Sequence, residues 1–113
     1  MDTVNALACL SALGHETRLA AFRVLVVAGP DGLTVGELRD QLAVPPATLS
    51  AHLNVLRAAG LVADRREGRA IHVSAGFARI DALLAYLTEN CCRGTPCVPT
   101  TGASALHHAC PGA

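Results

Sequence analysis

The sequence predicts a mainly helical fold in which one small β-hairpin precedes the last helix. Apolar residues recur at helical spacing in several segments, glycine or proline stands where those segments end, and two alternating runs flank a glycine turn. With 113 residues the chain has room for one domain, and with 3% aromatic residues its core must be built from Leu, Val, Ala and Ile. A core of this size is marginal alone, and a dimer would bury much more surface.

Two helices are expected at the beginning of the chain. Residues 3–12 form a short apolar segment that Gly14 ends. Residues 15–29 repeat apolar side chains at helical spacing up to Gly29, which Pro30 follows. The next residues predict a turn and a short extended segment.

Two further short helices are expected, joined by a tight turn. Thr34 stands three residues before Glu37, which is the capping-box pattern of a helix that covers residues 35–43. Residues 44–60 open with two prolines, which a helix tolerates only in its first turn, and then place leucines on one face.

A hairpin and a last helix complete the pattern. Residues 61–66 and 69–74 alternate in the manner of strands around Gly68. Residues 76–90 then carry an apolar stripe at helical spacing. The order helix, helix, helix, helix, hairpin, helix is that of a winged helix-turn-helix (α-α-α-α-β-β-α).

The fourth predicted helix and the hairpin are candidates for reading DNA. The leucines of that helix take its inner face, so small polar side chains remain on the face that could enter a major groove. Net charge is zero, but arginine outnumbers acid between residues 41 and 75. Each feature alone would also suit a solvated surface, whereas their order and spacing together indicate DNA binding. The predicted DNA-binding residues are Thr48, Ser50, Ala51, His52, Asn54, Arg57, Arg65, Arg66 and Arg69.

Cysteines are concentrated near the end of the chain. The first ten residues lack the positive region of a signal peptide, and the most apolar run is too short to cross a bilayer, so a cytoplasmic location is expected. Thiols stay reduced there, which favours metal binding or redox chemistry over structural disulfides. Cys9, in an apolar segment, is instead expected to pack in the core.

Cys91, Cys92 and Cys97 form a candidate metal site. Adjacent Cα atoms lie about 3.8 Å apart, below the usual disulfide range of about 4.4–6.8 Å. Gly94 and Pro96 permit a turn that would return Cys97 to the pair. Three thiolates without another donor suit a soft ion, and trivalent arsenic or antimony takes three sulfurs in a pyramid.

These segments resemble the ArsR/SmtB family of bacterial metal-responsive repressors over roughly residues 5–90. The resemblance depends on the Thr-Arg opening of the second helix, on "LSAHLNVLRAAGLV" in the fourth and on "REGR" in the hairpin. It implies a homodimeric winged helix that pairs through its first and last helices. It also implies repression in the apo state and release of operator DNA when an inducer binds.

The resemblance leaves the inducer to be found from the residues. The third helix has no cysteine and the last helix no histidine, so two inducer sites known in the family are missing. The ending "LTENCC" is similar to that of an arsenite-responsive subgroup, which implies that Cys91, Cys92 and Cys97 bind As(III) or Sb(III). Methylated arsenic would need only two of these thiols.

Several alternatives remain open at this stage. The thiols could serve a redox or persulfide sensor, or they could bind zinc together with His107, His108 and Cys110. An enzyme is not expected, because no anion-cradling loop or general base accompanies the cysteines. We expect residues 1–90 to form the DNA-binding and dimerisation domain. Residues 91–113 would form a tail with the inducer site at 91–97 and a disordered remainder.

Overall fold

The computed structural model describes residues 1–94 and confirms the predicted order of elements. Its helices are α1 (Thr3–Leu13), α2 (Glu16–Ala28), α3 (Val35–Leu42), α4 (Pro46–Ala58) and α5 (Phe77–Leu87). Its strands are β1 (Leu33–Thr34), β2 (Val62–Glu67) and β3 (Ala70–Ala75). A 3₁₀ turn, Cys91–Gly94, follows α5.

The helices begin and end at residues that satisfy their backbone groups. The Asn5 N–H donates to the Asp2 side chain at 2.8 Å and begins α1. The capping box predicted for α3 is confirmed, since the Glu37 N–H donates to Thr34 Oγ1 at 3.1 Å and the Thr34 N–H donates to Glu37 Oε1 at 2.9 Å. The hydrogen bond that the carboxyl of Glu37 accepts from the Thr34 backbone, followed by the Thr34 side chain, holds the pKa of this carboxyl below its ordinary value of 4.5.

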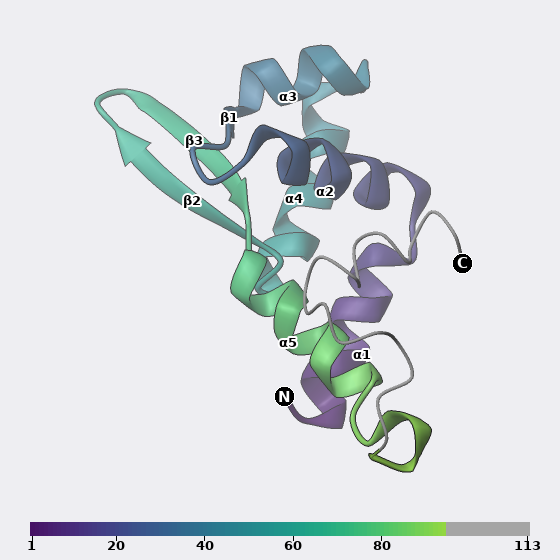
Figure 1. The fold of residues 1–113 in the computed structure, drawn as a ribbon. Coiled ribbons are helices and arrows are strands. Elements are labelled where there is room, and N and C mark those ends of the chain that lie inside the picture. Colours follow the sequence, from purple (N-terminus) through teal and green to yellow (C-terminus); the bar gives the residue numbers. More distant parts are fainter. Residues whose placement is uncertain (95–113) are drawn as a thin grey trace.

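The hairpin belongs to a small antiparallel sheet of order β1-β3-β2. Glu67 pairs with Ala70, so Gly68 and Arg69 form the turn, and Gly68 has the positive φ of 62° that such a turn requires. The short extended segment predicted after α2 is β1, which pairs with β3. The hairpin β2–β3 projects from the helices and is called the wing below (Figure 1).

The core is aliphatic, as predicted, and lies where α2, α3 and α4 pack on the sheet and where α1 packs on α2 and α4. Leu25, Leu38, Leu49, Leu56 and Leu61 are fully buried. Cys9 is also fully buried, which confirms that it packs in the core. No polar side chain is buried within residues 1–94.

Helices α1 and α5 lie side by side at the end of the molecule that is far from the wing (Figure 1). Tyr86 Oη of α5 lies 2.6 Å from Thr3 Oγ1 of α1, within hydrogen-bond distance. The two helices expose large apolar side chains, namely Val4, Leu7, Leu10, Leu84 and Leu87. In the described part of the chain no helix is long and apolar enough to span a bilayer.

The last helix is shorter than the sequence predicted. It ends at Leu87 rather than Asn90, because Thr88 caps it and Asn90 turns into the left-handed region at φ 56°. Thr88 Oγ1 donates to the Leu84 carbonyl at 2.8 Å, which occupies an acceptor of the last turn. Cys91 and Cys92 were predicted to lie at the end of this helix. They lie instead in the separate 3₁₀ turn beyond it.

Candidate nucleic-acid interface and cysteine site

Helix α4 is fixed by its leucines and presents small side chains outward. Leu49, Leu53 and Leu56 are 0%, 1% and 0% exposed, which fixes the rotation of the helix about its axis. The residues predicted to read DNA lie on the other side, and four of them, Thr48, Ser50, Ala51 and Asn54, are exposed. We call α4 the recognition helix.

The first turn of the recognition helix has no side-chain cap. Pro45 occupies the N-cap position and Pro46 the first helical position, so neither offers a hydroxyl or carboxylate to the helix amides. The uncapped amides and the dipole of a helix end favour a nearby anion, such as a backbone phosphate. Ala43, left-handed at φ 54°, ends α3 and makes the sharp turn into this helix.

A salt bridge fastens the recognition helix to the base of the wing. Arg57 Nε donates to the Asp64 carboxylate, with distances of 3.1 Å to Oδ1 and 3.0 Å to Oδ2. Arg57 Nη1 also donates to Asn54 Oδ1 at 2.9 Å. Arg57 therefore positions Asn54 and the wing as well as adding charge to the surface, a role that the sequence analysis missed.

The wing arginines do not share one direction. Successive side chains of a strand point to opposite faces, so Arg65 and Arg66 lie on different sides of the hairpin. Arg65 donates to Glu67 at 2.9 Å and to the Asp31 carbonyl at 3.3 Å, which holds it against the loop before β1. Arg66 and Arg69 are exposed, and Arg69 lies in the turn itself.

His52 is half-buried and differs from the other predicted DNA-binding residues in its surroundings. Its ring lies 4.5 Å from that of His15, centroid to centroid, and its Nδ1 lies 3.4 Å from Arg18 Nη1. Arg18 was not among the predicted site residues. The sequence shows that Arg18 stands about one helical turn after His15. Only the packing of α2 on α4 brings Arg18 next to His52.

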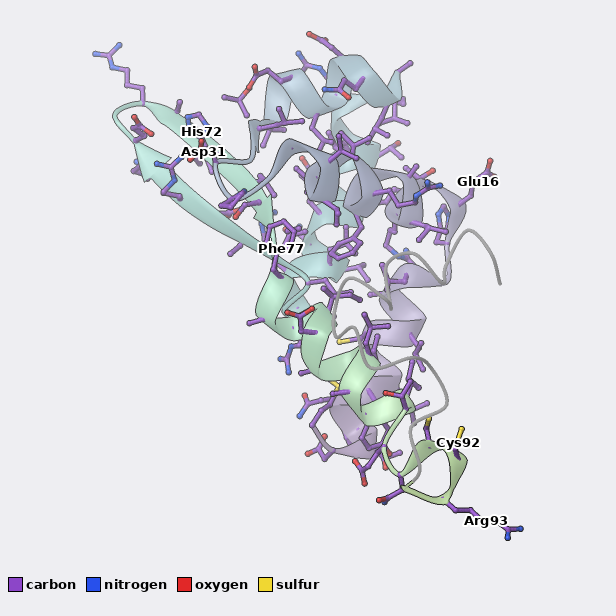
Figure 2. The ribbon with its side chains drawn as sticks, in the orientation of Figure 1. Glu16, Asp31, His72, Phe77, Cys92 and Arg93 are labelled. Carbon is purple, nitrogen blue, oxygen red and sulfur yellow. The ribbon has the colours of Figure 1, made fainter. Side chains whose placement is uncertain are left out.

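The cysteine turn lies at the opposite end of the molecule from the wing. Figure 2 shows Cys92 and Arg93 there, far from His72 on β3. Cys91 and Cys92 are exposed, and their sulfurs lie 3.6 Å apart. Three residues of this end, Asn90, Cys92 and Arg93, have φ between 55° and 58°, a region that side-chain-bearing residues seldom adopt.

The sulfur separation suits two ligands of one ion. Sulfurs bound at about 2.3 Å, with an angle of about 90–110° between the two bonds, lie about 3.3–3.8 Å apart. A disulfide between them would need about 2.05 Å, so the two sulfurs are not bonded to each other. Cys92 does belong to a disulfide in this structure, which must be reduced before its sulfur can bind an ion as a thiolate. Residues 1–94 hold no group of three or more potential metal-binding side chains. The predicted third ligand, Cys97, lies outside the described residues, as do Cys110, His107 and His108.

Comparisons with known proteins identify the DNA-binding part of the chain. The helix-turn-helix domain family matches residues 13–65. The HTH-type transcriptional regulator YceK of Bacillus subtilis is 40% identical over 76 residues, which cover 67% of this chain and 72% of YceK.

Two solved structures share the fold. The ArsR-like transcriptional regulator from Rhodococcus sp. RHA1 superposes with a TM-score of 0.67 at 28% identity, covering 74% of this chain and 76% of that one. The homodimeric winged helix-turn-helix domain of Mb0332 from Mycobacterium bovis, a possible ArsR-family regulator, superposes with a TM-score of 0.60 at 25% identity. That match covers 76% of this chain and 80% of the other.

Proposed function

Because this chain belongs to the helix-turn-helix transcriptional regulators and has the fold of their ArsR-like members, we propose that it is a homodimeric repressor released from DNA by trivalent arsenic. The inducer would bind Cys91, Cys92 and Cys97. The observation that carries this proposal is the exposed pair of sulfurs 3.6 Å apart, in the 3₁₀ turn that follows α5, a helix that packs on α1.

The apolar surface of α1 and α5 supports a homodimer. Val4 is 76% exposed, Leu7 60% and Leu87 54%, which is costly for side chains of this size in a single chain. A two-fold axis beside these helices would bury them and present two recognition helices to DNA. The two recognition helices of the dimer must lie about 34–36 Å apart to enter successive major grooves.

The inducer would bind through sulfur alone. Under reducing conditions Cys91 and Cys92 would supply two thiolates at a suitable separation. Cys97, five residues after Cys92, would supply the third. Antimony(III) would use the same three ligands. A methylated arsenic(III) would need only two and would not depend on Cys97.

A series of contacts connects the cysteine turn to the recognition helix. The Cys91 N–H donates to the Thr88 carbonyl at 3.0 Å, and Thr88 caps α5. Tyr86 of α5 then contacts Thr3 of α1, and Cys9 of α1 donates to the Ala59 carbonyl at 3.5 Å, directly after α4. An ion that changes the turn would therefore act on both the dimer helices and the recognition helix. A hundredfold loss of affinity needs only about 2.7 kcal/mol of coupling.

X-ray absorption at the arsenic edge tests the binding step. We expect the reduced protein to hold one arsenic per subunit with three sulfur neighbours, and Cys97→Ser to reduce these to two. Cys110→Ser is the matched control, because it removes a cysteine from the same segment and should leave three. An arsenic surrounded by oxygen in the wild type would refute the assignment.

Zinc and thiol oxidants are the competing inducers. Zinc prefers four ligands, so a zinc response would depend on His107, His108 or Cys110. A redox or persulfide sensor would release DNA on oxidant treatment without any metalloid. Titrating each agent against the same protein–DNA complex separates the three.

A further inference from the structure

Three side chains at the junction of α2 and α4 form a cluster with no part in the cysteine site. His15 is the N-cap of α2, Arg18 lies in the first turn of that helix, and His52 lies in the middle of the recognition helix. Arg18 and His52 are half-buried, while His15 is exposed. Among residues 1–94, His15 and Arg18 are the titratable or charged groups that the structure records facing His52.

The hydrogen bonds require both imidazoles to be neutral. Arg18 can only donate, so His52 Nδ1, 3.4 Å from Arg18 Nη1, must accept. The Thr17 N–H donates to His15 Nδ1 at 3.1 Å, so that nitrogen must also carry a lone pair. Each ring therefore carries its proton on Nε2.

Arg18 connects three helices through one guanidinium. Its Nε donates to the Ala12 carbonyl at 2.6 Å and its Nη2 to the Ser11 carbonyl at 3.4 Å, both in the last turn of α1. Its Nη1 faces His52 of α4. Arg18 itself belongs to α2, so this one side chain joins the end of α1 to the middle of the recognition helix.

Protonation of His52 would break this connection. A proton on Nδ1 would face the Arg18 donor and remove the acceptor, and the new charge would lie beside the guanidinium. Burial, then His15, then Arg18 lower the pKa of His52 below its ordinary value of 6.5. The neutral, connected state is therefore the one present at neutral pH.

We propose that His52 is a proton-sensitive latch of the recognition helix, whose protonation detaches it from Arg18 and weakens operator binding as the pH falls. This inference rests on operator binding in the proposed function but not on the arsenite response. It gives a repressor of this kind a second input, acidification, at a site remote from the cysteines.

The sign of the pH effect separates the latch from the other role predicted for His52. A histidine that contacts a phosphate would bind DNA more tightly when protonated, because the charge attracts the phosphate. A latch has the opposite effect. One competing proton would weaken binding by up to about tenfold per pH unit, below the pKa of His52 in the free protein, and two such protons in a dimer by up to about a hundredfold.

The test is fluorescence anisotropy with an operator duplex that the apo protein selects from random DNA. The affinity is measured at constant ionic strength between about pH 7.5 and 5.5, within the range where histidine titrates. His52→Asn keeps an acceptor near the position of Nδ1 but cannot be protonated, and His15→Asn keeps an N-cap for α2. His72→Asn removes a histidine from the wing as the matched control. Circular dichroism at each pH confirms that the protein remains folded.

We expect wild-type affinity to fall at least about fivefold over this range, and His52→Asn to lose most of that dependence. His72→Asn should retain the pH dependence of the affinity, and His15→Asn should lose less of it than His52→Asn does. Wild-type binding that strengthens on acidification, or a pH dependence that His52→Asn leaves intact, would overturn the latch. If the apo protein selects no DNA even at about pH 7.5, operator binding itself fails, which is a different result.

Discussion

The recognition helix and the cysteine turn are built in opposite ways. The helix is fixed by buried leucines on one side, by Arg57 and Asp64 at its C-terminal end and by Arg18 at its middle. The turn is exposed, and Cys92 and Arg93 both adopt left-handed backbone conformations. One end of the molecule is packed on the core, and the other is an exposed turn with a strained backbone.

This difference suits the two tasks proposed for them. Reading base edges requires side chains that are already in place, because any ordering on binding would cost affinity. A sensor needs two states, and an exposed turn with a strained backbone can be reorganised by a few bonds to an ion. The left-handed residues would each cost on the order of 1 kcal/mol, a cost that bonds to an ion can offset.

The largest effect on the rigid half should come from its core. Leu53→Ala should lower the free energy of unfolding by about 2–5 kcal/mol, because it opens a cavity under the recognition helix. Val55→Ala, at a position that is 41% exposed in the same helix, is the matched control and should cost less than about 1 kcal/mol. Urea unfolding followed by circular dichroism measures both. Equal losses would mean that the leucine face does not hold the helix.

A smaller effect is expected where the wing meets the phosphates. Arg69→Ala should weaken operator binding by about fivefold to tenfold and reduce the slope of log K against log salt by about one per subunit. Arg23→Ala removes an exposed arginine of α2, outside the wing turn and the recognition helix, and should change neither quantity. A salt slope that both variants leave unchanged would exclude the wing turn from the DNA interface.

The smallest effect concerns the capping box of α3. Thr34→Ala should cost about 1 kcal/mol of stability at neutral pH. The lowered pKa of Glu37 means that its contribution is complete above 4.5 and is lost as the pH falls through the lower, folded-state pKa. Glu37→Gln should therefore reduce the dependence of stability on pH in this acid range. Urea unfolding at several pH values measures this. If the free energy of unfolding of Glu37→Gln falls with acid as much as that of the wild type, the prediction is wrong.

Local signals were enough to predict most of the rigid half. The capping box, the proline pair before the recognition helix and the leucine spacing each act within a few residues, so the sequence displays them directly. The same holds for the turn at Gly68, where the hairpin reverses. Backbone and packing agree over these segments, which is why the element order was correct.

The contacts that join the elements could not be predicted in this way. Arg18 and His52 are 34 residues apart in sequence, and Thr3 and Tyr86 are 83 apart, so only the packed fold brings each pair together. The end of α5 was also missed, because its apolar stripe continues in pattern while Thr88 and Asn90 turn the backbone away. The predicted role of Cys97 remains a prediction.

Release of operator DNA by arsenite is the measurement that tests the account most directly. Anisotropy of a labelled operator duplex is followed under reducing conditions for the wild type and for Cys91→Ser, Cys92→Ser and Cys97→Ser, with Cys110→Ser as the control. The account predicts that arsenite releases the wild type and the control, with affinity falling about a hundredfold, while the other three variants stay bound. If the wild type ignores arsenite, or if Cys91→Ser releases DNA as the wild type does, the cysteine turn is not the arsenite sensor.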